Sequence, residues 1–162
     1  MDINFLKKVI LFKQLSDEEI EIFAQKLKEL HVKEGNTIIK ENEDSDKLFI
    51  LYNGEVSISK KITMINEEEQ INKTLSTLSG SDHQFFGEIG LLGFMKGTAN
   101  VFARTDCTLY TINQKSFLEI CDKHPGIGFK ILLEISRKLS RLLEKMNEDI
   151  LKLTTALIYA LK

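Results

Sequence analysis

The chain has 162 residues, of which 43% are hydrophobic and 28% are charged; these values are typical of a single folded domain and exclude a disordered or collagen-like chain. Its 22 basic and 24 acidic residues give a formal net charge of -2, which disfavours general binding to nucleic acid. Cys107 and Cys121 lack the paired spacing of a disulfide framework or a zinc site, so we expect reduced thiols and a cytoplasmic protein.

The N-terminal segment, residues 1–30, has the pattern of a helix. Ser16 and Glu19 form an S-x-x-E capping box, and apolar residues follow at helical spacing. The sequence therefore predicts a helix from about Asp17 to Leu30. Charged residues interrupt the start of the chain, and no window approaches the ~18 to 20 apolar residues needed to cross a bilayer. We therefore expect neither a signal peptide nor a membrane partner.

Residues 31–113 have the pattern of a β-rich unit. Alternation and β-branched residues predict short strands, separated by turns that contain Gly, Asn and Asp. The predicted strands are TIIK, LFILY, EVSIS, TLSTL, NVFA and a last strand over residues 108–112. We interpret NEEEQINK, residues 66–73, as a solvated loop at the tip of a hairpin. Many short antiparallel strands indicate a sandwich, a roll or a barrel.

Residues 114–162 return to a helical pattern. A short helix is predicted over Gln114–Asp122, and the HPG of His124–Gly126 interrupts the chain. From about Ile127, one long amphipathic helix is predicted. Its apolar stripe consists of Ile135, Leu139, Leu142, Met146, Ile150, Leu153, Leu157 and Leu161. This stripe could form a homodimer, bind another protein, or fold back as one more core helix.

The chain contains, in this order, the strings LFKQLSDEEIEIFA, GNTIIKENEDSDKLFILYNGEVSIS and TDCTLYTINQKSFLEI. Together they resemble the cyclic-nucleotide-binding domain of the catabolite activator protein and protein kinase A regulatory subunit family. The first string is similar to the family's opening helix, the second to its first strands, and the third to its last strand and following helix. The resemblance spans roughly Val9 to Met146. It implies one α+β domain: an antiparallel β-roll, jelly-roll-like, with an N-terminal helix and a long C-terminal helix.

The string FGEIGLLGFMKGTANV, residues 86–101, is similar in length and pattern to the family's phosphate-binding cassette. Gly87 permits a positive φ or a close approach, and residues 89–93 should form one helical turn whose first amides can hold phosphate. The resemblance implies that Glu88 binds the ribose 2′-hydroxyl. Taken in isolation, Gly87 would be interpreted as a turn residue and Glu88 as a carboxylate that complements the dipole at a helix start. The implied ligand-binding residues are Gly87, Glu88, Ile89, Gly90, Leu91, Lys96, Thr98 and Ala99.

The cassette departs from the family at its Pro-Arg pair, because Lys96 and Gly97 occupy those positions. The missing arginine would hold the cyclic phosphate, and a hydrogen bond to a charged group contributes about 1.5 to 3 kcal/mol, or ten- to a hundredfold in affinity. Lys96 could supply a point charge or lie in solvent, and Thr98 could bind the phosphate or serve only in a strand. Using Arg104 instead would change the cassette's length. Asn42 replaces a family glycine but tolerates the left-handed conformation.

The sequence thus predicts a regulatory module that binds cyclic AMP or cyclic GMP and relays binding through the C-terminal helix. The alternative is a degenerate domain that has lost its ligand and acts in protein interaction or dimerisation. We expect no enzyme activity and no metal or cofactor, because His31, His83 and His124 lie in unrelated contexts and no catalytic motif occurs. We also expect no DNA binding, since the last stretch, NEDILKLTTALIYALK, is too short for a helix-turn-helix domain and has only two lysines.

Overall fold

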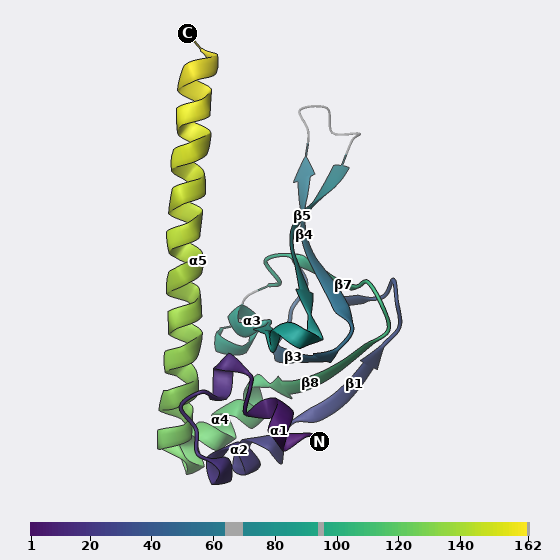
Figure 1. Ribbon diagram of the computed structural model, residues 1–162, viewed down its shortest axis with the longest axis vertical. Coiled ribbons are helices and arrows are strands. Elements are labelled where there is room, and N and C mark those ends of the chain that lie inside the picture. The colour runs from purple at the N-terminus through teal and green to yellow at the C-terminus, as the bar shows by residue number, and fades with distance from the viewer. Residues whose placement is uncertain (64–69, 94–95, 162) are drawn as a thin grey trace.

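The computed structural model describes residues 1–63, 70–93 and 96–161. Figure 1 shows a rolled sheet with helices gathered at one side and one long C-terminal helix. The helices are α1 (Ile3–Leu6), α2 (Asp17–Ala24), α3 (Glu88–Leu92), α4 (Gln114–Lys123) and α5 (Pro125–Ala160), with 3₁₀ turns η1 (Ile10–Phe12) and η2 (Gly80–Asp82). The strands are β1 (Lys28–Val32), β2 (Thr37–Ile39), β3 (Lys47–Asn53), β4 (Glu55–Thr63), β5 (Gln70–Ser79), β6 (Phe85–Phe86), β7 (Asn100–Ala103) and β8 (Cys107–Asn113).

Two antiparallel sheets of four strands make up the roll. One has the order β1-β8-β3-β6 and the other the order β2-β7-β4-β5. Alternate side chains of both sheets point inward, so that residues far apart in the chain share one core. This core contains Ile39, Phe49, Leu51, Val56, Phe86, Val101, Ala103, Cys107 and Leu109. The predicted fold class, an α+β domain built on an antiparallel roll with an N-terminal helix and a long C-terminal helix, is confirmed.

The helix predicted to reach Leu30 ends earlier. The capping box of Ser16 and Glu19 is present at its start, but α2 stops at Ala24 with Gln25 as its C-cap. The prediction is wrong beyond this point, because Lys28–Val32 is strand β1 and pairs with β8 over its whole length. Leu27 is still buried, in the turn between helix and strand. The pairing of β1 with a buried strand outweighs a weak helical preference.

The hairpin of β4 and β5 is longer than predicted. Residues 70–73, which we interpreted as part of a loop, belong to β5, and Lys73 lies opposite Lys60 of β4. The remainder of that loop, residues 66–69, lies outside the described residues. Pairing along the full hairpin satisfies the backbone groups of a polar stretch that has no apolar alternation.

The two C-terminal helices follow the predicted pattern. Asn113 caps α4 by accepting a hydrogen bond at Oδ1 from the Ser116 amide at 3.0 Å. Pro125 then occupies the first turn of α5, where its missing N–H breaks no helical hydrogen bond. The first turns of α5 pack Ile131 and Ile135 into the core beside η1 and α4. The rest of α5 extends past the roll (Figure 1).

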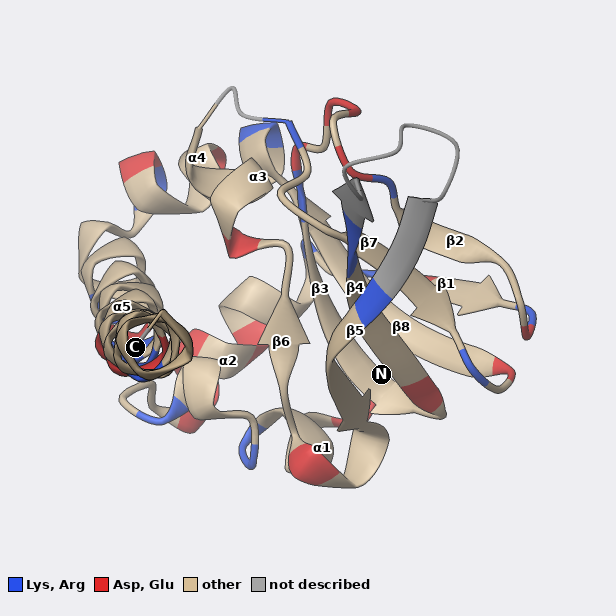
Figure 2. Cartoon of the chain, turned by 90° about the horizontal axis from the view of Figure 1, so that it is seen from above, with Lys and Arg blue, Asp and Glu red and all other residues tan. Residues whose placement is uncertain are grey.

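In the part of the chain that the structure describes, positive and negative residues are interspersed (Figure 2). Figure 2 looks along α5 and shows acidic and basic positions interspersed around the described loops and helices. Within residues 1–63, 70–93 and 96–161, no helix is both long and apolar enough to cross a membrane. In the same residues, His, Cys, Asp and Glu side chains form no group of three that could hold a metal ion.

Candidate functional site

The predicted cassette begins where β6 leaves the roll. Phe85 and Phe86 are buried, and Gly87 follows with φ at 84°, in the left-handed region that glycine adopts without a steric cost. The chain then turns at once into α3, which starts at Glu88, one residue earlier than the predicted turn over residues 89–93. Gln114 of α4 donates from Nε2 to the Leu91 carbonyl at 3.0 Å and so satisfies an acceptor at the end of α3.

Glu88, the residue implied to bind ribose, is buried and already has a charged partner. The residue is 5% exposed, and Oε1 lies 3.0 Å from Nζ of Lys138 on α5. The same ammonium donates to the Phe85 carbonyl at 2.6 Å and lies 4.2 Å from the centroid of the Phe85 ring. One lysine of α5 therefore contacts both the strand that leads into the cassette and the first residue of its helix.

Burial lowers the pKa of Lys138 below its ordinary value of 10.5, and attraction to the Glu88 carboxylate opposes this shift. The Glu88 carboxylate thus stabilises the charged form of Lys138. Removing either partner from such a pair leaves an uncompensated buried charge, at a cost of about 3–5 kcal/mol. This ion pair therefore joins the start of α3 to α5.

The other predicted residues of α3 differ in what they can offer a ligand. Ile89 is half-buried, whereas Gly90 is buried and Leu91 is 1% exposed in the main core. The Leu91 side chain is a packing residue, and its amide donates to the Gly87 carbonyl at 3.1 Å. Side chains of this helix other than Glu88 could contribute only apolar contacts.

The second half of the cassette is an arm, residues 96–100, that lies against the turn between β2 and β3. Lys96 forms an isolated β-bridge with Asp44, and the Gly97 amide donates to the Glu43 carbonyl at 2.8 Å. Lys96 and Thr98 are exposed, and Ala99 is half-buried. Phe94 and Met95, between α3 and the arm, lie outside the described residues.

The turn itself contains Asn42, which has φ at 66°. Asn42 therefore adopts the left-handed conformation that asparagine was expected to tolerate. The Asn42 amide donates to the Gly97 carbonyl at 2.9 Å, so that arm and turn exchange hydrogen bonds in both directions. Arg104 donates from its backbone to the Glu55 carbonyl and from its side chain to Thr77, away from this arm, so no shifted register brings it into the cassette.

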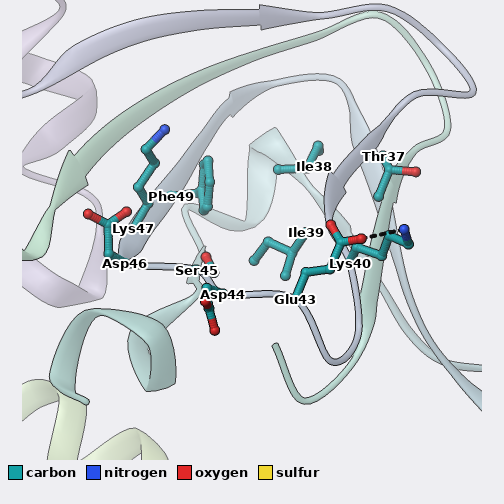
Figure 3. Close-up of a pocket in the computed structure, with 10 residues that line it drawn as sticks. All are labelled: Thr37, Ile38, Ile39, Lys40, Glu43, Asp44, Ser45, Asp46, Lys47 and Phe49. Carbon is teal, nitrogen blue, oxygen red and sulfur yellow. Dashed lines mark hydrogen bonds and ion pairs between the residues drawn. The ribbon is translucent and has the colours of Figure 1, made fainter. Parts of the chain in front are cut away.

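A cavity of about 310 Å³ lies beside the cassette, between β2 and β3 (Figure 3). Ile39 and Phe49 give it an apolar wall, and an ion pair between Lys40 and Glu43 stands at its rim. It is lined by Thr37, Ile38, Ile39, Lys40, Glu43, Asp44, Ser45, Asp46, Lys47 and Phe49. A Cβ at Gly87 would lie 3.2 Å from the Phe49 ring and 3.5 Å from Ile39, so the first turn of the cassette adjoins this wall.

Sequence reasoning missed Lys138. A signal was present, because Lys138 stands three residues after Ile135 and seven after Ile131, on the face of α5 that packs against the roll. A basic residue on a buried face needs an acceptor, and Glu88 is the buried carboxylate nearby.

Sequence reasoning also missed a buried polar pair next to the arm. Ser59 of β4 lies opposite Asn100 of β7, and both are buried. Oδ1 of Asn100 accepts a hydrogen bond from the Glu41 amide at 3.0 Å, whereas Nδ2 of Asn100 and Oγ of Ser59 have no partner within the described part of the chain. Asn100 therefore adds a further tie between the arm and the turn.

The chain is similar to known proteins. The profile of the family described as "Cyclic nucleotide-binding domain" matches residues 29–124. The cGMP-dependent protein kinase egl-4 of Caenorhabditis elegans is 32% identical over 115 residues, which cover 70% of this chain and 14% of the kinase. The chain thus spans only about a seventh of the length of this curated relative.

Solved structures show the same fold. The catabolite activator protein of Thermus thermophilus matches with a TM-score of 0.77 at 20% identity, over 90% of this chain and 63% of that protein. The structure described as cAMP bound PfPKA-R matches with a TM-score of 0.61 at 32% identity, over 73% of this chain and 39% of that one.

Proposed function

This chain belongs to the cyclic nucleotide-binding domain family, and we propose that it is a regulatory module, without catalytic activity, that binds cyclic AMP or cyclic GMP at the cassette. The observation that carries the proposal is the pairing of buried Glu88 with Lys138 of α5. The family resemblance implies that Glu88 binds the ribose hydroxyl, and the same carboxylate pairs with Lys138 of the long helix. Relatives named for cGMP and for cAMP support both nucleotides as candidates.

The proposed ligand would place its phosphate at the start of α3, its ribose hydroxyl on Glu88 and its base toward α5. Aligned peptide dipoles and unpaired amides favour an anion at the start of a helix. With Gly97 in place of arginine, the arm offers only the exposed side chains of Lys96 and Thr98. We therefore expect affinity about ten- to a hundredfold below that of a site with an arginine fork.

The proposed relay runs through the Glu88 carboxylate. A carboxylate can accept several hydrogen bonds, so Glu88 can accept one from a ribose hydroxyl while Lys138 stays near. The hydroxyl would then interact with the same carboxylate charge that attracts Lys138. The strength of the Glu88–Lys138 ion pair, and with it the attachment of α5, would change. The ligand can shift α5 only by its difference in affinity for the two arrangements of the helix.

Titration calorimetry with cyclic AMP and cyclic GMP tests the proposal. We expect heat of binding for at least one of them, with no such heat from the non-cyclic 5′-monophosphates. Glu88→Gln should weaken binding about tenfold or more, because it removes the charged acceptor from the ribose. Absence of heat with both cyclic nucleotides at millimolar concentration would refute the nucleotide-binding function.

The relay has its own test. Lys138→Met should leave nucleotide binding detectable but abolish ligand-induced changes in hydrogen exchange along α5. Lys130→Met is the matched control, because Lys130 lies on the same helix but pairs with Glu19 of α2 at 2.7 Å. A relay that persists in Lys138→Met and disappears in Lys130→Met would place the coupling elsewhere.

A second candidate function, self-association, is favoured by the outer part of α5. Apolar residues recur there at alternating steps of four and three, the spacing of a two-stranded coiled coil. These residues are Leu143, Met146, Ile150, Leu153 and Leu157, and they continue the pattern from Leu139, which packs against the core. Most of them are well exposed, with Leu153 at 71% and Leu157 at 60%. We propose a two-fold homodimer along this seam, in which identical residues of two copies meet.

The two functions are compatible but independent. A domain that no longer binds a nucleotide would still form this seam, since no seam residue belongs to the cassette. If calorimetry shows no binding while the chain is dimeric, the dimerisation function stands alone.

A further inference from the structure

Three glycines of the cassette lie against main-chain carbonyls of one continuous segment, residues 40–47. A Cβ built on any of the three would approach a carbonyl oxygen to less than 3.0 Å, closer than real side chains come. The pairs are Gly87 with Lys47, Gly90 with Ser45, and Gly97 with Lys40. The segment therefore contacts both the helical end of the cassette and its arm.

Main-chain hydrogen bonds hold the arm on the same segment. They are Asn42 N–H to Gly97 O at 2.9 Å, Gly97 N–H to Glu43 O at 2.8 Å, and Glu41 N–H to Asn100 Oδ1 at 3.0 Å, in addition to the β-bridge of Asp44 with Lys96. The far end of the segment is fixed as well, because the Gln114 amide donates to the Asp46 carbonyl at 2.8 Å.

We propose that residues 40–47 form a brace that fixes both ends of the cassette through main-chain contacts, and that this brace restricts position 97 to glycine. A side chain at 97 would start 2.6 Å from the Lys40 carbonyl oxygen and 3.1 Å from Ile39. A carbonyl oxygen in a hydrogen-bonded segment cannot rotate away as the end of a flexible side chain could. The absence of an arginine at 97 is then a consequence of local packing.

The brace has two consequences that add detail to the proposed function. The second of them rests on that function. First, no residue at position 97 can reach into the site, so a ligand must be held by the other elements of the cassette. Second, the arm keeps its place when a nucleotide binds, and the response is left to the Glu88–Lys138 contact and α5. Both consequences follow from the contact between Gly97 and the Lys40 carbonyl of the brace.

Gly97→Ala tests the brace without any ligand. We expect the midpoint of thermal unfolding to fall by roughly 3 to 10 °C, because the added methyl group overpacks the contact with Lys40. Gly126→Ala is the matched control, since nothing lies within 4 Å of its Cβ position and alanine favours the helix. Its midpoint should stay unchanged or rise. Equal midpoints for the two variants would overturn the proposal.

Gly97→Arg sharpens the result. The brace predicts a destabilised protein with no gain in affinity for cyclic AMP or cyclic GMP. A variant that unfolds at the wild-type midpoint and binds either nucleotide more tightly would show that position 97 has room, and would overturn the brace while supporting nucleotide binding. A wild-type chain that binds no nucleotide would instead refute the proposed function and leave the ligand-free test of the brace valid.

Hydrogen exchange of the wild-type chain gives a measurement that needs no variant. The amides of Asn42 and Gly97 should exchange as slowly as those of a paired strand, and added nucleotide should leave their rates unchanged. Exchange at the rate of an open loop, or a large change in these two amides on binding, would contradict the brace.

Discussion

The two parts of α5 share one sequence period but differ in what covers their apolar side chains. In the inner part, Ile127, Ile131 and Ile135 are buried against the chain's own helices. From Leu142 onward the apolar positions are exposed, and the helix runs beyond the roll (Figure 1). The amphipathic pattern therefore predicts a helix in both parts. It does not show whether the apolar face packs against the same chain or against another one.

The difference has a physical reason. Most helical stability in proteins comes from the packing of an amphipathic face and not from intrinsic propensity. The inner part obtains that packing from η1 and α4. In the outer part the apolar side chains from Leu142 onward are exposed, and the homodimer proposed above would cover them.

The largest expected effect comes from a substitution in the buried inner part of α5. Ile131 is 0% exposed, and Ile131→Ala should lower the free energy of unfolding by about 2–5 kcal/mol, through lost burial and the cavity that remains. Chemical denaturation measures this loss directly.

Ile158→Ala is the matched control for the outer part. Ile158 is 53% exposed and lies off the proposed seam, so its truncation should change the free energy of unfolding by no more than about 0.5 kcal/mol. Similar losses of unfolding free energy for Ile131→Ala and Ile158→Ala would show that the apolar side chains of both parts of α5 are equally buried. That result would contradict the difference between the two parts.

The next largest effect is expected from a substitution in the proposed dimer seam. Leu153→Glu places a charge at the centre of a dimer interface, so we expect the dissociation constant of the dimer to rise by roughly a hundredfold or more, because a buried unpaired charge is costly. Sedimentation measured across micromolar concentrations should show a dimer for the wild type and a monomer for this variant.

Thr155→Glu supplies the control, since it adds the same charge two residues later on the opposite face of the helix. It should leave the dimer intact. A wild-type chain that sediments as a monomer at these concentrations would rule out the seam.

Sequence reasoning reached local features more easily than contacts between segments. The capping box of Ser16 and Glu19, and the turn at Gly87 followed by a short helix, are both written in a few neighbouring residues. The family resemblance supplied the order of the elements. The end of α2 was wrong because pairing of Lys28–Val32 with β8 depends on residues at the far end of the chain.

The site shows the same limit. The missing arginine was visible in the sequence, but its setting was not, because the Lys40 carbonyl that meets Gly97 belongs to a segment far from it in the chain. The partner of Glu88 was missed for the same reason, as Lys138 comes from α5. The roles of Gly87, Glu88, Lys96 and Thr98 toward a ligand remain predictions until binding is measured.

Acid gives the smallest effect, and within α5 it should act on the inner part, where Glu134 has a shifted pKa. Glu134 is buried there and accepts hydrogen bonds at Oε1 from Gln14 and Arg137, both at 2.6 Å. Burial raises the pKa of Glu134, but these two donors outweigh it and hold the pKa below its ordinary value of 4.5. A hydrogen bond from Lys130 likewise lowers the pKa of Glu19, which ties α2 to α5.

Because both carboxyl groups titrate at lower pH in the folded chain than in the unfolded one, the unfolded state binds more protons as the pH falls. Their stabilising contribution is fully present above pH 4.5 and is lost as the pH falls through the folded pKa values. Glu134→Gln should therefore be less stable than wild type at pH 7, with the difference narrowing below about pH 4. Glu144→Gln, in the exposed outer part, should match wild type throughout. A difference for Glu134→Gln that stays constant from pH 7 to pH 3 would mean that its carboxylate does not hold the inner part of α5 against the N-terminal segment.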